Sequence, residues 1–202
     1  PCRARATFEQ EYAFVYGKVS ALAHLGGLKG AALWSAVFAA APGGRVVAMG
    51  ACAALKAVAS DAFGNATAEK RVRCARPTAD LSEFHALLAR AAFVVGVGRP
   101  YASPTPLEAL ACGTPVLLPR GQHPFLEAVV EARGGEGVPF PTFDDADGFA
   151  AALARARGAA TTSTAGAPHG NDTGPIFAEV PGMTDRGVLE NVRRLLGDAQ
   201  SC

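Results

Sequence analysis

The sequence predicts an α/β fold built on a doubly wound parallel sheet. Short apolar runs alternate along the chain with segments of helical periodicity, and several of these runs are apolar at every position, as in strands covered on both faces. Strands that alternate with helices form parallel sheets through right-handed crossovers. The chain has 202 residues, half of them hydrophobic, which is enough for one core. We expect the sheet domain to occupy residues 10–157.

Six short segments are the expected strands. The run of Phe93, Val94 and Val95 is the clearest of them, because it contains no polar residue. The last segment is short enough to be only an edge strand. The expected strands are 13–16, 45–51, 71–75, 93–97, 115–118 and 138–140.

Helical patterns fill the intervals between these strands. The first is broken by Gly26-Gly27 and stopped by Pro42-Gly43-Gly44, and the second is weak and is followed by a loop at Gly64-Asn65. Asp80 is a candidate N-cap, and Asp144-Asp145 precede the last helix of the domain. Leu81, Phe84, Leu87 and Leu88 share one face of the helix after Asp80. The expected helices are 19–41, 53–62, 81–91, 106–111, 123–132 and 146–157.

The end of the chain differs in composition from the sheet domain. Residues 158–175 are rich in Thr, Ser, Gly and Ala and predict a flexible insertion. Residues 176–202 contain an amphipathic pattern, predicted as a C-terminal helix and tail that pack back onto the domain or cross to another one.

Charge and hydropathy exclude several classes of function. The net charge is +1 with no basic stripe, so we expect no nucleic-acid partner. No apolar run reaches the ~18 residues that a membrane span needs. The chain begins with Pro1 and not with Met, which is typical of a fragment, so we expect any membrane anchor in a segment outside this chain.

Cysteines and histidines do not have metal-ligand spacing, and we expect no metal site. The four histidines, His24, His85, His123 and His169, are scattered, and no two cysteines form a C-x-x-C pair. Cys52, Cys74 and Cys112 have apolar neighbours and are predicted to be buried small hydrophobes. Cys2 and Cys202 lie at the ends, where pairing with each other and pairing with missing chain are both open.

Two sequons begin at Asn65 and Asn171. Each is a candidate glycosylation site if the chain enters the secretory pathway. Such triplets are also common by chance, so they give a lumenal location little weight.

Two loops are candidates for the functional site, because ligands bind outside the carboxyl ends of parallel strands where the strand order switches. The first is Tyr16-Gly17-Lys18, where Gly17 allows a tight turn and Lys18 brings a positive charge to the end of a strand. The other interpretation is a turn glycine followed by a solvated lysine.

The second loop joins the strand 93–97 to a helix. Thr105-Pro106-Leu107-Glu108 has the form of a capping box with proline at the first helical position. A helix N-terminus there offers amide donors to a pyrophosphate, and Glu108 is placed to accept from two ribose hydroxyls. Glu108 as a helix cap alone is the other interpretation. Gly96-Val97-Gly98 is not a dinucleotide fingerprint, because Tyr101 stands where the third glycine is needed.

At these loops the sequence resembles a known family of glycosyltransferases. Four segments resemble, in order, motifs of the alpha-1,6-mannosylglycoprotein 6-beta-N-acetylglucosaminyltransferases (N-acetylglucosaminyltransferase V, glycosyltransferase family 18). Part of the most specific block, Pro-Leu-Glu-Ala followed by Gly-x-Pro-Val, is also similar to other GT-B glycosyltransferases. The segments are 14–19 (FVYGKV), 93–101 (FVVGVGRPY), 104–111 (PTPLEALA) and 122–127 (QHPFLE).

The resemblance implies the Rossmann-like C-terminal half of a GT-B enzyme. Such an enzyme transfers N-acetylglucosamine from UDP-GlcNAc to the 6-hydroxyl of an alpha-mannose of an N-glycan, with inversion and with no metal or other cofactor. It also implies a Golgi location and a missing N-terminal half that supplies the general base. On the resemblance, Lys18 is catalytic through the diphosphate leaving group and Glu108 holds the ribose. The other implied donor-binding residues are Gly17, Arg76 near the uracil, Gly98, Tyr101, Ser103 and Thr105.

The sequence also departs from the family pattern. Ala102 replaces a glutamate of the family, and the stretch between residue 119 and Gln122 is much shorter. These departures concern the acceptor contacts more than the nucleotide site. The alternatives are another GT-B enzyme with a different nucleoside diphosphate sugar, and a binding module without catalysis. A retaining GT-B enzyme commonly has a second glutamate at the position of Pro100, which argues against that class here.

Overall fold

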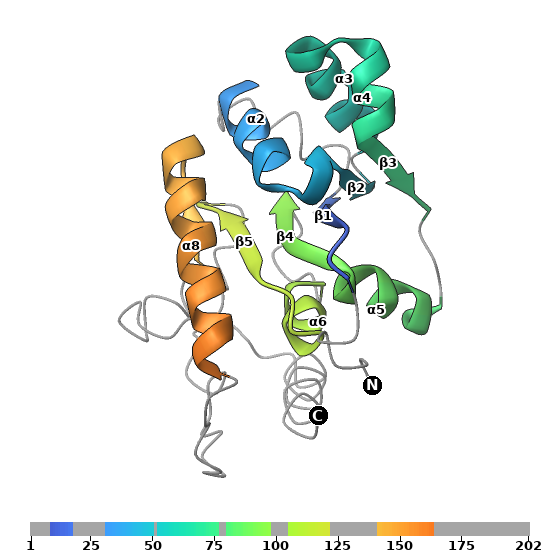
Figure 1. Cartoon of the computed structure of the whole chain (residues 1–202). Helices are drawn as coiled ribbons and strands as arrows, with labels where there is room; N and C mark the ends of the chain where they lie inside the picture. Colours follow the sequence, from blue (N-terminus) through green and yellow to red (C-terminus); the bar gives the residue numbers. More distant parts are fainter. Residues whose placement is uncertain are drawn as a thin grey trace.

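The structure, a computed structural model, describes residues 9–17, 31–50, 52–76, 80–97, 105–121 and 141–163. Its centre is a six-stranded sheet in the order β3-β2-β1-β4-β5-β6, and every neighbouring pair of strands is parallel (Figure 1). Helices flank the sheet on both sides. The predicted fold class, α/β with a doubly wound parallel sheet, is therefore confirmed.

The strands match the apolar runs of the sequence closely. β4 is buried at all seven positions, as its continuous apolar pattern predicts. The segment predicted as an edge strand, 138–140, lies outside the described residues, and β6 follows it at a position that was not predicted. The strands are β1 (Tyr12–Gly17), β2 (Val46–Met49), β3 (Val72–Ala75), β4 (Ala91–Val97), β5 (Val116–Pro119) and β6 (Thr142–Phe143).

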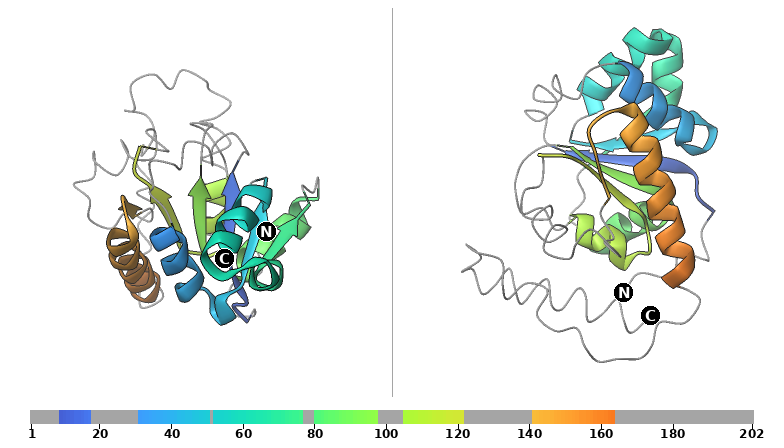
Figure 2. Two further views of the ribbon diagram at one scale, coloured as in Figure 1. Left: turned by 90° about the horizontal axis from the view of Figure 1, so that it is seen from above. Right: turned by 90° about the vertical axis from the view of Figure 1, so that its left-hand side faces the viewer.

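The helices form two layers on the sheet. Helices α2 and α3 lie on one side and α5 and α6 on the other, while α8 covers β5 and β6 on the side of α2 (Figures 1 and 2). The predicted helices 123–132 and 176–202 lie outside the described residues, as does the first part of 19–41. The helices are α2 (Ala31–Ala40), the 3-10 turn η3 (Pro42–Gly44), α3 (Cys52–Phe63), α4 (Asn65–Arg71), α5 (Leu81–Ala89), α6 (Thr105–Ala111) and α8 (Ala146–Ser163).

Side-chain caps begin two of these helices where the sequence predicts them. The carboxylate of Asp80 accepts hydrogen bonds from the backbone amides of Ser82 at 2.8 Å and Glu83 at 3.4 Å. The carboxylate of Asp145 accepts from the amide of Gly148 at 2.7 Å. Both carboxylates satisfy amides that have no partner within the helix, so both helices begin where predicted.

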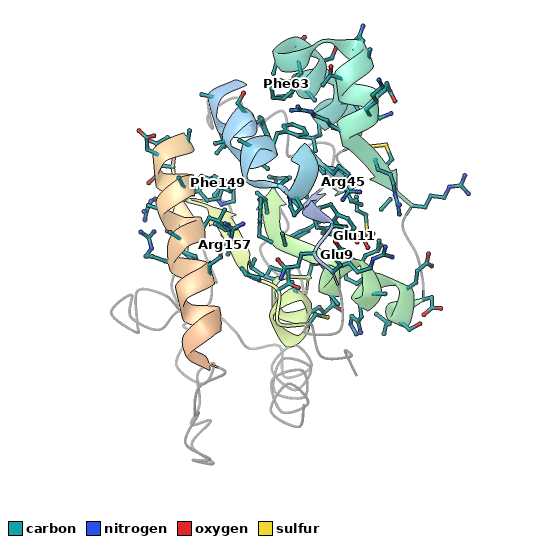
Figure 3. All side chains as sticks on the ribbon, in the orientation of Figure 1. Glu9, Glu11, Arg45, Phe63, Phe149 and Arg157 are labelled. Atoms are coloured by element: carbon teal, nitrogen blue, oxygen red, sulfur yellow. A yellow bond between two sulfur atoms is a disulfide. The ribbon has the colours of Figure 1, made fainter. Side chains whose placement is uncertain are left out.

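Alternate strand residues divide the core between the two helical layers. Ala13 and Val15 of β1 belong to the larger cluster under α2, α3 and α8, whereas the ring of Phe14 meets that of Phe84 on α5, 6.3 Å away. Phe149 on α8 points toward the sheet (Figure 3) and packs edge-on against Phe93 and Phe143, at 5.7 Å and 5.4 Å. The sheet is thus buried on both faces.

The region from α3 to β3 differs from its prediction. Gly64-Asn65 is no loop, because α4 begins at Asn65 directly after Gly64. Only Ala68 of α4 is buried, so the short helix has no apolar periodicity to reveal it. Contacts to α3 hold it instead: Lys56 pairs with Glu69 at 2.5 Å, and the Arg71 guanidinium lies 4.9 Å from the centre of the Phe63 ring.

Two further predictions about helices were wrong. Leu81 does not share the buried face of α5 but is 62% exposed, because it is the first residue of the helix. Helix α8 continues six residues past its predicted end at Arg157 and finishes at Ser163, within the segment predicted as a flexible insertion. The Gly-Ala-Thr composition of this last part is weak in helix propensity, which is why the sequence did not indicate it.

The cysteines also correct the prediction. Cys52, the first residue of α3, forms a disulfide with Cys74 in β3, with 5.4 Å between their Cα atoms. Cys74 is exposed and Cys52 is only partly buried, so neither is a buried free thiol. Cys112 is buried, as expected, with 3% of its surface exposed, but it too is disulfide-bonded. The prediction of buried free thiols was therefore wrong, because apolar neighbours in the sequence do not distinguish a free cysteine from a disulfide-bonded one.

A buried threonine fixes α6 against α5. Thr114 is fully buried, and its hydroxyl donates to the carbonyl oxygen of Leu88 at 2.7 Å. Its amide donates to the carbonyl oxygen of Ala109, at the end of α6. The position of α6 matters for function because this helix carries Glu108.

Among the described residues, no helix is both long enough and apolar enough to cross a bilayer.

Candidate functional site

The strand order places a topological switch between β1 and β4. From β1 the sheet continues through β2 to β3, and from β4 it continues in the opposite direction through β5 to β6. Gly17, the last residue of β1, is the register partner of Val97, the last residue of β4. Connections that run to opposite sides leave a crevice at the carboxyl ends of such a pair, which is where open parallel sheets bind ligands. The predicted Gly17 site thus lies at this switch point.

The strand ends at the switch point are packed so closely that two glycines are required. A Cβ atom on Gly17 would overlap the carbonyl oxygen of Val97 and lie 2.6 Å from its Cγ2. A Cβ atom on Gly50, just after β2, would overlap the carbonyl oxygen of Gly17. Both glycines are therefore required by the close approach of the main chain at the ends of β2, β1 and β4.

Glu108 is the described acidic residue of the second predicted loop. It lies in the first turn of α6 and is half-buried. Burial raises the pKa of its carboxyl group above the ordinary value of 4.5. A partly desolvated carboxylate in a first helical turn is a strong acceptor for hydroxyl donors, so it is suited to a ribose.

Two other predicted residues lie along the same edge. Arg76 follows β3 and is exposed; β3 is two strands from β1, or roughly 10 Å at the usual strand spacing. Thr105 is the first residue of α6, one position earlier than predicted, and is partly buried. Lys18, Gly98, Tyr101 and Ser103 lie outside the described residues. The structure therefore brings Gly17 to the switch point, with Arg76 at the end of a strand farther along the sheet.

The two predicted glycosylation sites have different outcomes. Asn65 is exposed at the start of α4, where its side chain hydrogen-bonds to the hydroxyl of Ser60. It belongs to the helical layer and not to the carboxyl edge of the sheet. Asn171 lies outside the described residues.

Gly50 was not among the predicted site residues. Its signal in the sequence is a glycine directly after the buried run of β2, and its backbone has φ +80°, which favours glycine. That signal is common in turns, and only the contact with Gly17 distinguishes this glycine from the others. The two residues of this contact are 33 positions apart, so the contact cannot be predicted from the sequence without knowing the strand order.

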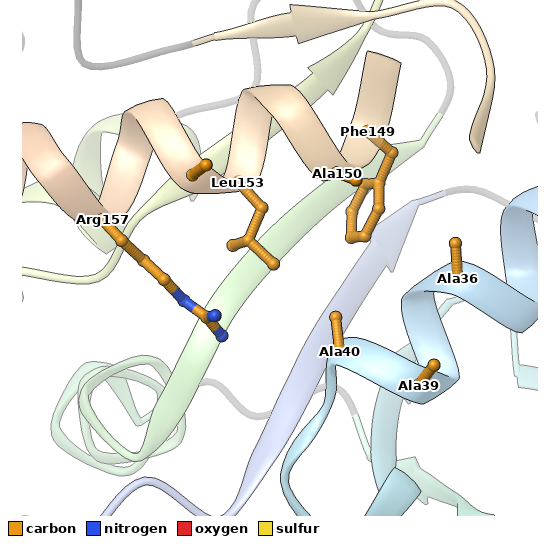
Figure 4. A pocket seen from close by; sticks show the side chains of 8 residues that line it. Ala36, Ala39, Ala40, Phe149, Ala150, Leu153 and Arg157 are labelled. Carbon is orange, nitrogen blue, oxygen red and sulfur yellow. The ribbon is translucent and has the colours of Figure 1, made fainter. Parts of the chain in front are cut away.

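A shallow groove of about 430 Å³ lies elsewhere, between α2 and α8 (Figure 4). Its walls are almost entirely apolar, with Arg157 as the single charged residue. Alanines and one arginine give it no acid, base or nucleophile, so it is no candidate active site. The lining residues are Ala36, Ala39, Ala40, Phe149, Ala150, Leu153, Ala154 and Arg157.

Within the ranges that the structure describes, no three acidic, cysteine or histidine side chains gather in one place as metal ligands would. The disulfides already occupy the cysteines of this part of the chain.

Comparison with known proteins supports the fold. A solved structure of a mutant O-GlcNAc transferase from Thermobaculum terrenum, a GT-B glycosyltransferase, aligns with a TM-score of 0.52 and 16% sequence identity. The alignment covers 98% of this chain and 34% of that protein, so the chain spans about a third of its length. No protein-family model and no curated protein matches the sequence. The resemblance to the 6-beta-N-acetylglucosaminyltransferases therefore rests on the sequence motifs alone.

Proposed function

We propose that this chain is the donor-binding half of a glycosyltransferase and that it binds a UDP-sugar at the carboxyl edge of its sheet. The observation that carries the proposal is the switch point itself, where Gly17 at the end of β1 pairs with Val97 at the end of β4 and is contacted from the β2 side by Gly50. Helix α6, with its half-buried Glu108, follows β4. The fold shared with an O-GlcNAc transferase supports the same class of reaction.

Each residue has a role in this proposal. The main chain at Gly17 receives the diphosphate, and Lys18, the next residue, stabilises the negative charge that develops as the sugar leaves. Glu108 accepts hydrogen bonds from the ribose hydroxyls. Arg76 faces the uracil, and Thr105 lies with Gly98, Tyr101 and Ser103 around the phosphates and the sugar. A lysine in place of a metal ion makes the reaction metal-independent.

The finer assignment comes from the resemblance. We propose UDP-GlcNAc as the donor, the 6-hydroxyl of an alpha-mannose of an N-glycan as the acceptor, and inversion at the anomeric carbon. The general base that deprotonates this hydroxyl would come from an N-terminal half. The acceptor and linkage are separable from the donor site, because the departures at Ala102 and before Gln122 concern the acceptor side.

Binding of UDP tests the donor site. A ligand that binds only the folded state raises the melting temperature by mass action, by an amount that grows as RT ln(1 + [L]/Kd). We expect millimolar UDP to raise the melting temperature of the chain, and uridine without phosphates to raise it less. If a well-folded chain melts at the same temperature with and without UDP, the donor site is assigned wrongly. Transfer of GlcNAc by the full-length protein distinguishes an enzyme from a binding module.

We also propose that the protein resides in the lumen of the Golgi. The exposed Cys52–Cys74 disulfide supports an oxidising compartment, and the exposed Asn65 is accessible to a glycan. In secreted expression we expect Asn65→Gln to remove one glycan, detected as a mobility shift that matches the loss after glycosidase treatment. Because Asn65 lies in a helix of the folded chain, the glycan would be added before folding. An unglycosylated wild-type chain from secreting cells would contradict the location.

A further inference from the structure

The turn after β2 is in direct contact with the end of β1. Gly50 has φ +80°, and a Cβ atom there would overlap the carbonyl oxygen of Gly17 and lie 3.2 Å from its carbonyl carbon. Gly17 in turn leaves no space for a side chain against Val97. The ends of β2, β1 and β4 are thus in contact one after another, so a displacement of Gly50 displaces Gly17.

The same turn is tied covalently to its other neighbour. Cys52, two residues after Gly50, is bonded to Cys74 in β3. Helix α3 is already docked by Leu55 and Ala59, which are fully buried. The disulfide is instead partly exposed and lies at the start of the helix. The disulfide therefore constrains the turn that contains Gly50 more than it stabilises the core beneath α3.

We propose that Gly50 and the Cys52–Cys74 disulfide are positioning elements of the donor site, holding the end of β1 in the geometry that binds the diphosphate. This inference rests on the proposed function. The disulfide fixes the turn from the β3 side, and Gly50 transmits that constraint to the Gly17 carbonyl by close contact. Neither element touches the donor. Each acts through Gly17, whose main chain meets the diphosphate.

Two variants test the proposal with a matched control. Gly50→Ala forces a Cβ atom onto Gly17, whereas Gly64→Ala places alanine at nearly the same positive φ, +81°, with nothing within 4 Å. Both variants carry the same kind of backbone strain, but only the first disturbs β1. The double variant Cys52→Ser/Cys74→Ser removes the disulfide and leaves the glycine contact in place. UDP affinity is measured by calorimetric titration well below the melting temperature of each variant.

We expect Gly50→Ala and the double serine variant to bind UDP about tenfold more weakly. The wild-type protein holds the backbone of Gly17 in place before UDP binds, whereas in the variants binding itself must order this residue, at a cost in conformational entropy. Gly64→Ala should bind like wild type, even though its melting temperature falls. Hydrogen exchange at the amides of β1 should accelerate in the double variant. This last measurement needs no ligand and covers the case in which Gly50→Ala does not fold.

The outcomes separate the two levels of the proposal. A wild-type chain that does not bind UDP overturns the proposed function, and the positioning role with it. A wild-type chain that binds UDP, together with variants of undiminished affinity and unchanged exchange in β1, overturns the positioning role alone. Equal loss of affinity in Gly64→Ala and Gly50→Ala would also overturn it, since strain and not contact would then be the cause.

Discussion

Glu108 offers the sharpest separation between a binding role and a structural one. Glu108→Gln keeps the shape of the side chain and the capping contact, since a capping box accepts glutamine as well as glutamate. On the proposed ribose role, the change replaces a carboxylate that would accept from two hydroxyls by an amide with one acceptor oxygen. Hydrogen bonds to a charged group contribute about 1.5–3 kcal/mol, so UDP should bind roughly ten- to 150-fold more weakly.

The burial of Glu108 gives the sign of the stability change. Because burial raises the pKa of this carboxyl group above 4.5, the ionised form is disfavoured in the folded state. Below pH 4.5 the carboxyl group of Glu108 is protonated in both the folded and the unfolded state, and its contribution to stability is fully present. This contribution is lost as the pH rises through the pKa of the folded state. At neutral pH, Glu108→Gln should therefore leave the melting temperature unchanged or raise it. Because glutamine keeps the capping contact, a purely structural cap would also change the free energy of unfolding by less than about 1 kcal/mol, so the UDP affinity decides between the two roles.

The pH dependence of UDP binding supplies an independent measurement. As the pH falls through the raised pKa of Glu108, the wild-type carboxylate becomes protonated and loses an acceptor, so its advantage over Glu108→Gln should shrink. Taking the ratio of the two affinities at each pH cancels the titration of UDP itself. Asp147→Asn is the control, because it also removes a charge from a first helical turn, here an exposed one at the start of α8. A folded, stable variant whose affinity ratio to wild type stays at one across the whole pH range would reduce Glu108 to a cap.

Two further predictions concern Thr114 and Lys18. Thr114→Val keeps the size of the buried side chain but removes its donor to the carbonyl oxygen of Leu88, so the free energy of unfolding in urea should fall by about 1–3 kcal/mol, while Thr114→Ser, which keeps the hydroxyl, should lose less. A valine variant as stable as wild type would show that this hydrogen bond contributes nothing. On the proposed function, Lys18→Ala in the full-length protein should lower kcat more than it raises KM, because charge on the diphosphate is greatest in the transition state, and EDTA should leave the wild-type rate unchanged. A raised KM with the wild-type kcat would mean that Lys18 binds only the ground state.

The parts of the fold that the sequence predicted are those with a long apolar signal. β4 is buried at every position, and its pattern is unambiguous, as are the stops at Pro42-Gly43-Gly44. Helix α4 was not predicted because it is seven residues long and buries one alanine. Strand β6 was not predicted because a strand of two residues is too short to show a periodic pattern. Local pattern therefore predicts elements in proportion to how much apolar surface each of them buries.

The sequence predicted those residues of the candidate site that a single loop motif identifies, and no others. Gly17 and Glu108 stand out from their local contexts, one as a glycine at a strand end and the other in a capping box. Gly50 and the disulfide depend on which strands are neighbours. Cys74 is two positions past Val72 in β3, which pairs with β2, and only that pairing brings it next to Cys52. Contacts across the sheet are tertiary information that a loop motif does not contain.

The position of β1 also has a consequence for how the chain is made. Among the strands of the described sheet β1 comes first in the chain, yet its partner β4 is complete only at Val97, about 80 residues later. At a translation rate of about 5–20 residues per second, one edge of β1 waits roughly 4–16 seconds for its partner. Ala13, Phe14 and Val15 of this strand are fully buried in the finished domain. The nascent chain therefore passes through an interval with an apolar, unpaired strand edge, and we expect chaperone contacts and misassembly to involve this strand.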